Sequence, residues 1–182
     1  MVSNPEVLPG KTRILVVDDD SDLRLTLCEY LESRNFVVSS ARNGVEAVHL
    51  LRSGRHQFDI IFTDLIMPDG PDGLEVLKTA KEIYPLIYVV VMTGYSSMET
   101  AIESIRCGAF GYLAKPFRLE EVEIIANRIM EQLALIDDNR RLSRKLALLS
   151  ETSISIDSRL ERIELLLSRL TATQDPESKT LT

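Results

Sequence analysis

Short apolar runs alternate with amphipathic segments from Lys11 to Phe117. The runs cover residues 14–17, 36–39, 59–63, 87–92 and 111–114. They are rich in Val, Ile and Tyr with little polar alternation, which is typical of parallel strands covered on both faces. Helical spacing of apolar residues between them is found at Leu23, Leu27, Tyr30 and Leu31, at Val45, Val48 and Leu51, at Leu74, Leu77 and Ala80, and at Met98, Ala101, Ile102 and Ile105. Five strand–helix repeats predict an α/β fold with an open, doubly wound, five-stranded parallel sheet.

The pattern changes after Phe117, where glycine disappears and helix formers dominate. Two apolar registers follow, each with alternating spacings of four and three. The first contains Val122, Ala126, Ile129, Leu133 and Ile136, and the second contains Leu142, Leu146, Leu149, Ser153, Ile156, Leu160, Ile163, Leu167 and Leu170. This alternation predicts a coiled-coil seam.

Two arrangements of this C-terminal segment remain open. Residues 137–141 ("DDNRR") break the phase, which predicts a slip or a kink. Residues 150–157 are poor in helix formers, and Ser155 or Asp157 could cap a new helix. The segment is therefore either one long helix that pairs with a second chain or a helical hairpin that turns near 150–155. The second register keeps its phase across that stretch, which favours the homodimer.

Composition excludes several classes. The chain has 182 residues, of which 45% are hydrophobic, and a net charge of -7, which argues against direct binding to nucleic acid or to anionic membranes. There is neither a secretory signal nor an apolar run of about 20 residues. Cys28 and Cys107 lack metal-ligand spacing and predict small, semi-buried hydrophobes in a reducing compartment. We expect a cytoplasmic protein.

The stretch "RILVVDDDSD" places Asp18 and Asp19 after the first apolar run. Asp64, Thr93 and Lys115 follow later runs. If the fold is flavodoxin-like, the carboxyl ends of these strands bring all five residues to one cleft. Clustered carboxylates repel one another unless a cation binds them, and Mg²⁺ accepts few protein ligands together with water and phosphate. Lys115 adds a charge suited to a phosphate, and Thr93 adds a hydroxyl donor.

The fragments "VVDDD", "FTDLIMP", "VVVMTGY" and "GAFGYLAKPF" resemble, in order and spacing, the receiver domain of two-component response regulators, and the stretch "GYSSMETAIESIRCGAFGYLAKPF" most resembles the nitrogen-regulator subgroup. The resemblance covers about residues 11–135. It implies that Asp64 is the phospho-acceptor for a histidine kinase. It also implies that Asp19, Asp64 and the backbone carbonyl of Ile66 ligate Mg²⁺, with Asp18 acting mainly through bound water.

The resemblance assigns further switch residues. Lys115 would pair with the phosphoryl group, and Thr93 would turn to bond it. Tyr112 would follow Thr93 inward, while Gly94 leaves room for the donor. The Lys115–Pro116 peptide bond would be cis.

Other acidic residues have simpler interpretations. Asp20 and Asp22 predict an N-cap and a first-turn acid of the first helix. The stretch "MPDGPDG" is one residue longer than the family pattern, so Asp69 could approach the cation, although a turn is the more typical role of this sequence.

These features predict a response regulator that is not an enzyme and that signals through its receiver face and coiled coil to an unknown protein partner. We expect a flexible segment at 1–10, the receiver at 11–135, the coiled coil at 136–170 and a disordered tail at 171–182. We expect no DNA-binding output domain, because no helix-turn-helix pattern and no basic patch follow residue 118. The alternatives are a non-phosphorylated scaffold and a truncated fragment of a larger transcriptional regulator. A haloacid-dehalogenase-like phosphatase is excluded because its chemistry needs a second Asp two residues after the first, and position 66 is Ile. Nucleotide binding is excluded because no glycine-rich phosphate loop follows a strand.

Overall fold

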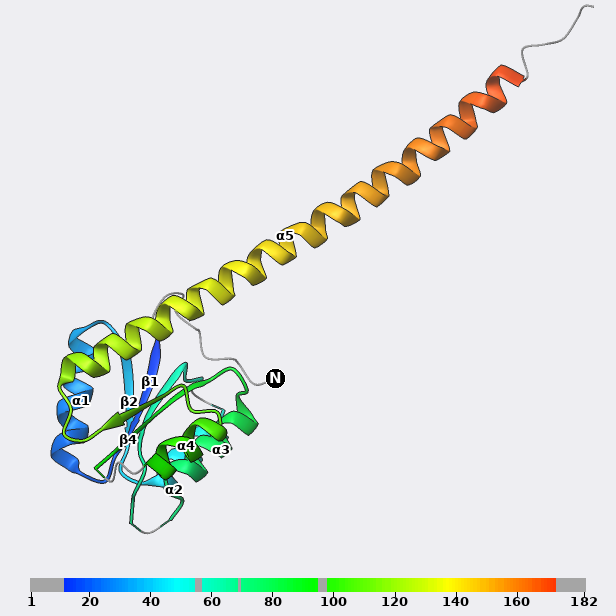
Figure 1. Cartoon of the computed structure of the whole chain (residues 1–182). Coiled ribbons are helices and arrows are strands. Elements are labelled where there is room, and N and C mark those ends of the chain that lie inside the picture. Colours follow the sequence, from blue (N-terminus) through cyan, green and yellow to red (C-terminus); the bar gives the residue numbers. More distant parts are fainter. Residues whose placement is uncertain (1–11, 55–56, 69, 95–97, 173–182) are drawn as a thin grey trace, which may run out of the picture. The chain divides into compact units, whose positions relative to one another are not determined.

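Strands and helices alternate along the chain in the computed structural model, which describes residues 12–54, 57–68, 70–94 and 98–172 (Figure 1). The strands are β1 (Arg13–Val17), β2 (Val37–Ala41), β3 (Ile60–Asp64), β4 (Tyr88–Thr93) and β5 (Gly111–Ala114). The helices are α1 (Ser21–Ser33), α2 (Gly44–Arg52), α3 (Gly73–Ile83), α4 (Met98–Arg106) and α5 (Leu119–Ala172). Each predicted apolar run therefore forms a strand, and each predicted amphipathic segment forms a helix.

The five strands form one parallel sheet in the order β2-β1-β3-β4-β5. Strand β1 lies between β2 and β3, so that Ile14 pairs with Val38 on one side and with Ile60 on the other. The chain reverses its direction of winding after β2, which is the flavodoxin-like arrangement. The predicted doubly wound, five-stranded fold is confirmed.

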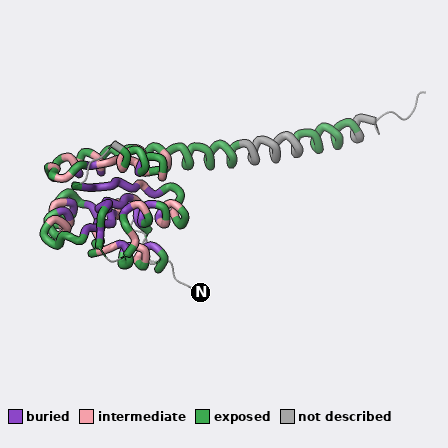
Figure 2. Tube along the Cα trace, turned by 60° about the horizontal axis from the view of Figure 1, so that its bottom comes forward, coloured by how far each residue is buried: buried purple, intermediate pink, exposed green. Residues whose placement is uncertain are grey.

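The core lies on both faces of the central strands, and Figure 2 shows burial concentrated there. Every residue of β3 is buried, as are the last five residues of β4. Strand β2 differs, because it forms an edge of the sheet, and Val37 is 37% exposed. The prediction that all five runs are covered on both faces was therefore wrong for β2, and also for the other edge strand β5, in which only Leu113 is buried.

Three apolar residues of the predicted helical pattern face solvent. Val45 is 54% exposed, Ile102 is 43% exposed and Ile105 is 63% exposed. The buried positions include Ala47 on α2 and Ser104 on α4. Ser104 is accommodated because its hydroxyl donates a hydrogen bond of 2.8 Å to a main-chain carbonyl one turn earlier.

Short polar side chains begin the helices beside the strand ends. The Asp20 carboxylate caps α1 by accepting hydrogen bonds from the main-chain N–H groups of Asp22 and Leu23, at 2.9 and 3.2 Å. Asp22 is the acid of the first turn, so the structure has both residues in the expected roles. Asp72 and Glu75 form a capping box at the start of α3. These caps fix where α1 and α3 begin.

The chain divides into two compact units, Met1–Gln132 and Leu133–Thr182, and α5 is continuous from one to the other. Val122, Ala126 and Ile129 at its start are fully buried. The helix runs through 137–141 and 150–157 without a new start, so the structure has the long helix and not the hairpin. Residues 137–149 and 160–168 are exposed (Figure 2). Among the described helices, none is both long and apolar enough to cross a membrane.

Candidate functional site

Polar residues lie at the carboxyl ends of four neighbouring strands, on the same side of the sheet. Asp18 directly follows β1, Asp64 ends β3, Thr93 ends β4 and Lys115 directly follows β5. The strands are parallel and adjacent, so their carboxyl ends meet at this edge. The structure therefore brings together residues that the sequence places up to 97 positions apart.

Lys115 connects two of the acidic residues. Its Nζ lies 2.8 Å from Asp18 Oδ2 and 2.7 Å from Asp64 Oδ2. The Asp18 side chain is fully buried, and that of Asp64 is 11% exposed. An ammonium group between two buried carboxylates offsets their mutual repulsion and part of their desolvation cost.

Asp18, Asp19 and Asp64 form a cluster of carboxylates. One oxygen from each lies within 4.8 Å of the others, and Asp19 is the exposed member. Hard divalent cations prefer such oxygen donors, and Mg²⁺ in particular keeps several waters besides one or two carboxylates. The donor set therefore fits this ion. Ile66, whose carbonyl is the remaining expected ligand, donates its main-chain N–H to Asp64 Oδ1 at 3.3 Å.

The surroundings shift the protonation of these groups. Burial raises the pKa of the Asp18 carboxyl, although the hydrogen bond from Lys115 acts in the opposite direction. Burial lowers the pKa of Lys115, but its hydrogen bonds to Asp18 and Asp64 outweigh that effect and raise it. The N–H groups of Leu23 and Asp22 lower the pKa of Asp20. Lys115 is therefore held as a cation.

The other predicted switch residues lie around this cluster. Thr93 is fully buried at the end of β4, and its main-chain carbonyl accepts a hydrogen bond of 2.7 Å from the N–H of Lys115. Gly94 is exposed. Tyr112 is half-buried on β5 and packs against the core. The Lys115–Pro116 peptide bond is cis. Asp69 lies outside the described residues.

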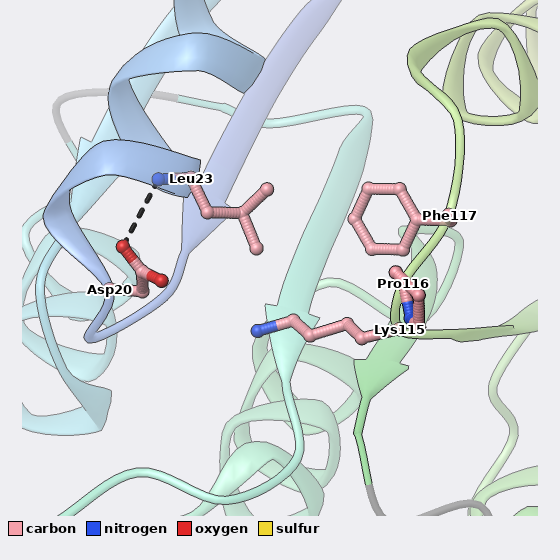
Figure 3. Close-up of a pocket in the computed structure, with 5 residues that line it drawn as sticks. All are labelled: Asp20, Leu23, Lys115, Pro116 and Phe117. Carbon is pink, nitrogen blue, oxygen red and sulfur yellow. Dashed lines mark hydrogen bonds between the residues drawn. The ribbon is translucent and has the colours of Figure 1, made fainter.

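A pocket of about 400 Å³ opens beside the cluster, and Figure 3 shows Leu23 and Phe117 on opposite sides of it. Lys115 and Asp20 supply its polar lining, and Pro116 completes it. The pocket gives the charged cluster an apolar neighbour that is large enough to receive a side chain.

Residues 14–127 match the family model described as the response regulator receiver domain. The chain belongs to this family. Receiver domains take phosphoryl groups from histidine kinases. The chain is 36% identical over 135 residues to the regulatory protein AtoC of Escherichia coli K12, covering 74% of this chain and 29% of AtoC. It is 36% identical over 115 residues to the DNA-binding transcriptional regulator NtrC of the same organism, covering 63% of this chain and 24% of NtrC. The chain thus spans about a quarter of the length of these curated relatives.

Solved receiver structures have the same fold. The receiver domain protein of Methanospirillum hungatei JF-1 has a TM-score of 0.63 at 28% identity, with 69% of this chain and 98% of that chain covered. A response regulator from Burkholderia pseudomallei, whose structure contains a phosphorylated aspartic acid, a calcium ion and citrate, has a TM-score of 0.58 at 32% identity. In that comparison, 69% of this chain and 74% of the other are covered.

The sequence did not reveal two residues that support the receiver site. Arg24 donates from Nη1 to the main-chain carbonyl of Asp18 at 2.6 Å. Gly73 packs so closely on the end of β3 that a Cβ there would overlap the main-chain oxygen of Asp64. The Asp72–Gly73 pair was read only as a turn signal, and one sequence alone gives no sign that Arg24 contacts the preceding loop.

Proposed function

We propose that this receiver is a phosphorylation switch that accepts a phosphoryl group on Asp64 from the phosphohistidine of a histidine kinase, with Mg²⁺ as cofactor. The observation that carries the proposal is the contact of Asp64 with Lys115 beside the carboxylates of Asp18 and Asp19. Asp64 ends β3, and 11% of its side chain surface is exposed at the carboxyl ends of the strands.

In the proposed step, an oxygen of Asp64 attacks the phosphorus of the donor. A P–O bond forms, the P–N bond to the donor imidazole breaks, and the imidazole keeps the electron pair of that bond and takes up a proton. Such a transfer requires positioning and charge neutralisation more than covalent chemistry from the protein. Lys115 supplies a fixed cation, and Thr93 supplies a hydroxyl donor at the adjacent strand end.

Asp18, Asp19, Asp64 and the Ile66 carbonyl would hold the Mg²⁺, which neutralises charge on the phosphoryl oxygens when it is bound. The pocket lined by Leu23, Pro116 and Phe117 supports access of a donor side chain from the side of α1. We further propose that Tyr112 and Thr93 change position on phosphorylation and alter the surface near α4 and β5.

Intact mass after incubation with acetyl phosphate and Mg²⁺ tests the phospho-acceptor. We expect a single phosphoryl group on the wild-type chain and none on Asp64→Asn. Asp59→Asn is the matched control, because Asp59 precedes the opposite end of the same strand and should leave phosphorylation intact. A chain that binds Mg²⁺ yet gains no phosphoryl group would instead be a pseudo-receiver that acts as a coiled-coil scaffold.

The output that we propose is pairing of α5 with α5 of a second copy of the chain. The exposed apolar residues of the second register continue with alternating spacings of four and three. Leu142, Leu146 and Leu149 are 57–67% exposed, and Leu160, Ile163 and Leu167 are 51–56% exposed. The side chains of Ile156 and Leu170 lie outside the described part of the chain. The helix is continuous over 119–172, so its two apolar registers do not pair with each other, and we propose a second copy of the chain as the partner.

A second candidate output is control of transcription within a larger regulator. It is supported by the similarity to NtrC, which is named a DNA-binding transcriptional regulator and of which the matched region is 24%. Transcript levels in cells that carry Asp64→Asn, compared with wild-type cells, test it. Unchanged transcripts would leave a protein partner of the coiled coil as the output.

A further inference from the structure

The Arg24 side chain of α1 donates hydrogen bonds to the main chain of the loop between β1 and α1. Arg24 Nη1 lies 2.6 Å from the main-chain oxygen of Asp18 and 3.5 Å from that of Asp19. Both carbonyls belong to residues whose side chains enter the carboxylate cluster. One guanidinium therefore contacts the backbone of two consecutive site residues.

These contacts orient the side chains on the same residues. Holding the carbonyl of Asp18 restrains the peptide plane between Asp18 and Asp19, and so narrows the range of positions that both side chains can take. The Asp18 side chain is further held by the N–H of Asp20 at 3.0 Å and by Lys115 at 2.8 Å. Asp19 is exposed, and its main-chain oxygen accepts a hydrogen bond of 3.5 Å from Arg24.

Arg24 is not explained as an ion-pair partner. Among the ion pairs of the described residues, none includes Arg24, whereas Arg34, Arg42 and Arg118 each contact a glutamate. Its short hydrogen bond goes to a main-chain carbonyl, which a planar guanidinium can bind with a fixed direction.

We propose that Arg24 is a positioning residue that sets the geometry of Asp18 and Asp19 for divalent cation binding. This inference rests on the proposed Mg²⁺ site. It has a definite sign. A cation that acted only through its charge would weaken Mg²⁺ binding, so that removing it would tighten the site. A positioning residue does the opposite, because its loss lets the carboxylates leave the orientation that the ion requires.

Isothermal titration of the full, unphosphorylated chain with MgCl₂ alone tests the sign. We expect Arg24→Gln to raise the Mg²⁺ dissociation constant about tenfold, the lower end of the effect of residues that orient metal ligands. Arg24→Lys, which keeps the charge and one donor, should lie between wild type and Arg24→Gln. Arg42→Gln is the control, because it removes an equal charge from an exposed pair with Glu46 and should bind Mg²⁺ as wild type does.

Unfolding in urea with EDTA, measured on the same variants, separates positioning from stability. Arg24→Gln that is folded in EDTA and binds Mg²⁺ as tightly as wild type, or more tightly, would overturn the inference. If Arg24→Gln does not fold, wild-type affinity in Arg24→Lys has the same consequence. A wild-type chain that is phosphorylated by acetyl phosphate but binds no Mg²⁺ would overturn the inference and leave Asp64 as acceptor.

Discussion

The ammonium group of Lys115 lies 2.7 Å from a carboxylate oxygen of Asp64, although 51 positions separate the two residues in the sequence. The same ammonium lies 2.8 Å from Asp18, whose side chain is fully buried. Lys115 therefore offsets part of the negative charge of Asp18, Asp19 and Asp64. This arrangement couples the stability of the fold to the occupancy of the site.

Lys115→Gln should destabilise the chain in EDTA and increase its stabilisation by Mg²⁺. Removing the ammonium leaves Asp18 and Asp64 without a counter-charge, and loss of one partner of a buried pair costs about 3 kcal/mol. A bound cation replaces the missing charge, and its contribution adds by mass action. Urea unfolding with and without MgCl₂ measures both effects.

Lys78→Gln is the control for the loss of a lysine, because Lys78 is exposed on α3. It should unfold as wild type does in both buffers. Equal stabilisation of Lys115→Gln and wild type by saturating Mg²⁺ would contradict the charge-balance interpretation.

Gly73→Ala should destabilise the chain and displace the backbone of Asp64. A Cβ at Gly73 would overlap the main-chain oxygen of Asp64 and come within 2.8 Å of Leu65 Cα, so the backbone around Asp64 must shift. Overpacking of this kind costs about 1–3 kcal/mol. Gly111→Ala is the matched control, because the nearest heavy atom to a Cβ built there is Val90 Cγ1 at 3.8 Å, an ordinary van der Waals distance. Gly73→Ala should unfold at a lower urea concentration than wild type and should be phosphorylated by acetyl phosphate more slowly, whereas the control should match wild type in both measurements. Equal behaviour of the two variants would refute the packing argument.

Most of the fold was readable because buried parallel strands need continuous apolar runs, and the residues that end those runs lie at one edge of the sheet. Asp20 could be assigned as a cap because its role depends only on neighbours in sequence. The exposure of Val37 could not be predicted from its apolar run, because it depends on the position of β2 as an edge strand of the sheet. Arg24 was missed for a related reason, since its contact with the Asp18 carbonyl depends on how the loop turns into α1.

The structure also gives a physical reason for the break in the pattern of α5. Val122, Ala126 and Ile129 are fully buried, and they occupy the first register. Leu135 is 64% exposed and lies seven positions before Leu142, so the second register already begins there. The two registers therefore overlap on different faces of one continuous helix, and no kink is needed at 137–141.

Asp59 should give a pH dependence opposite in sign to that of a salt-bridged carboxylate. Burial raises its pKa above the ordinary 3.8, although the N–H of Arg13 at 2.8 Å acts against the shift. The folded state therefore binds the proton more tightly than the unfolded state, and this stabilising contribution is lost as pH rises through the raised pKa. Asp59→Asn keeps an acceptor for Arg13 and carries no charge. We expect it to melt a few degrees above wild type at pH 7, with the difference shrinking as pH falls toward 3.8.

Thermal unfolding between pH 4.5 and pH 7.5 measures this effect. Asp138→Asn, at an exposed position on α5, supplies the control for the loss of a negative charge. A gain for Asp59→Asn that is constant with pH would show that packing and not ionisation is responsible.

Leu160→Glu combined with Leu167→Glu should convert dimers into monomers. Burying a leucine side chain in the seam contributes about 1.5–3 kcal/mol to the free energy of pairing. Loss of two leucines from each chain should therefore raise the dimer dissociation constant by several orders of magnitude. Leu148→Glu combined with Leu165→Glu is the matched control, because these leucines are also exposed on α5, at 64% and 54%, but lie off the seam. Sedimentation velocity should show dimers for wild type and for the control, and monomers for the seam variant. Dimers that persist in the seam variant would move the interface to another surface, such as the exposed Ile102 and Ile105 of α4, and a monomeric wild type would refute pairing altogether.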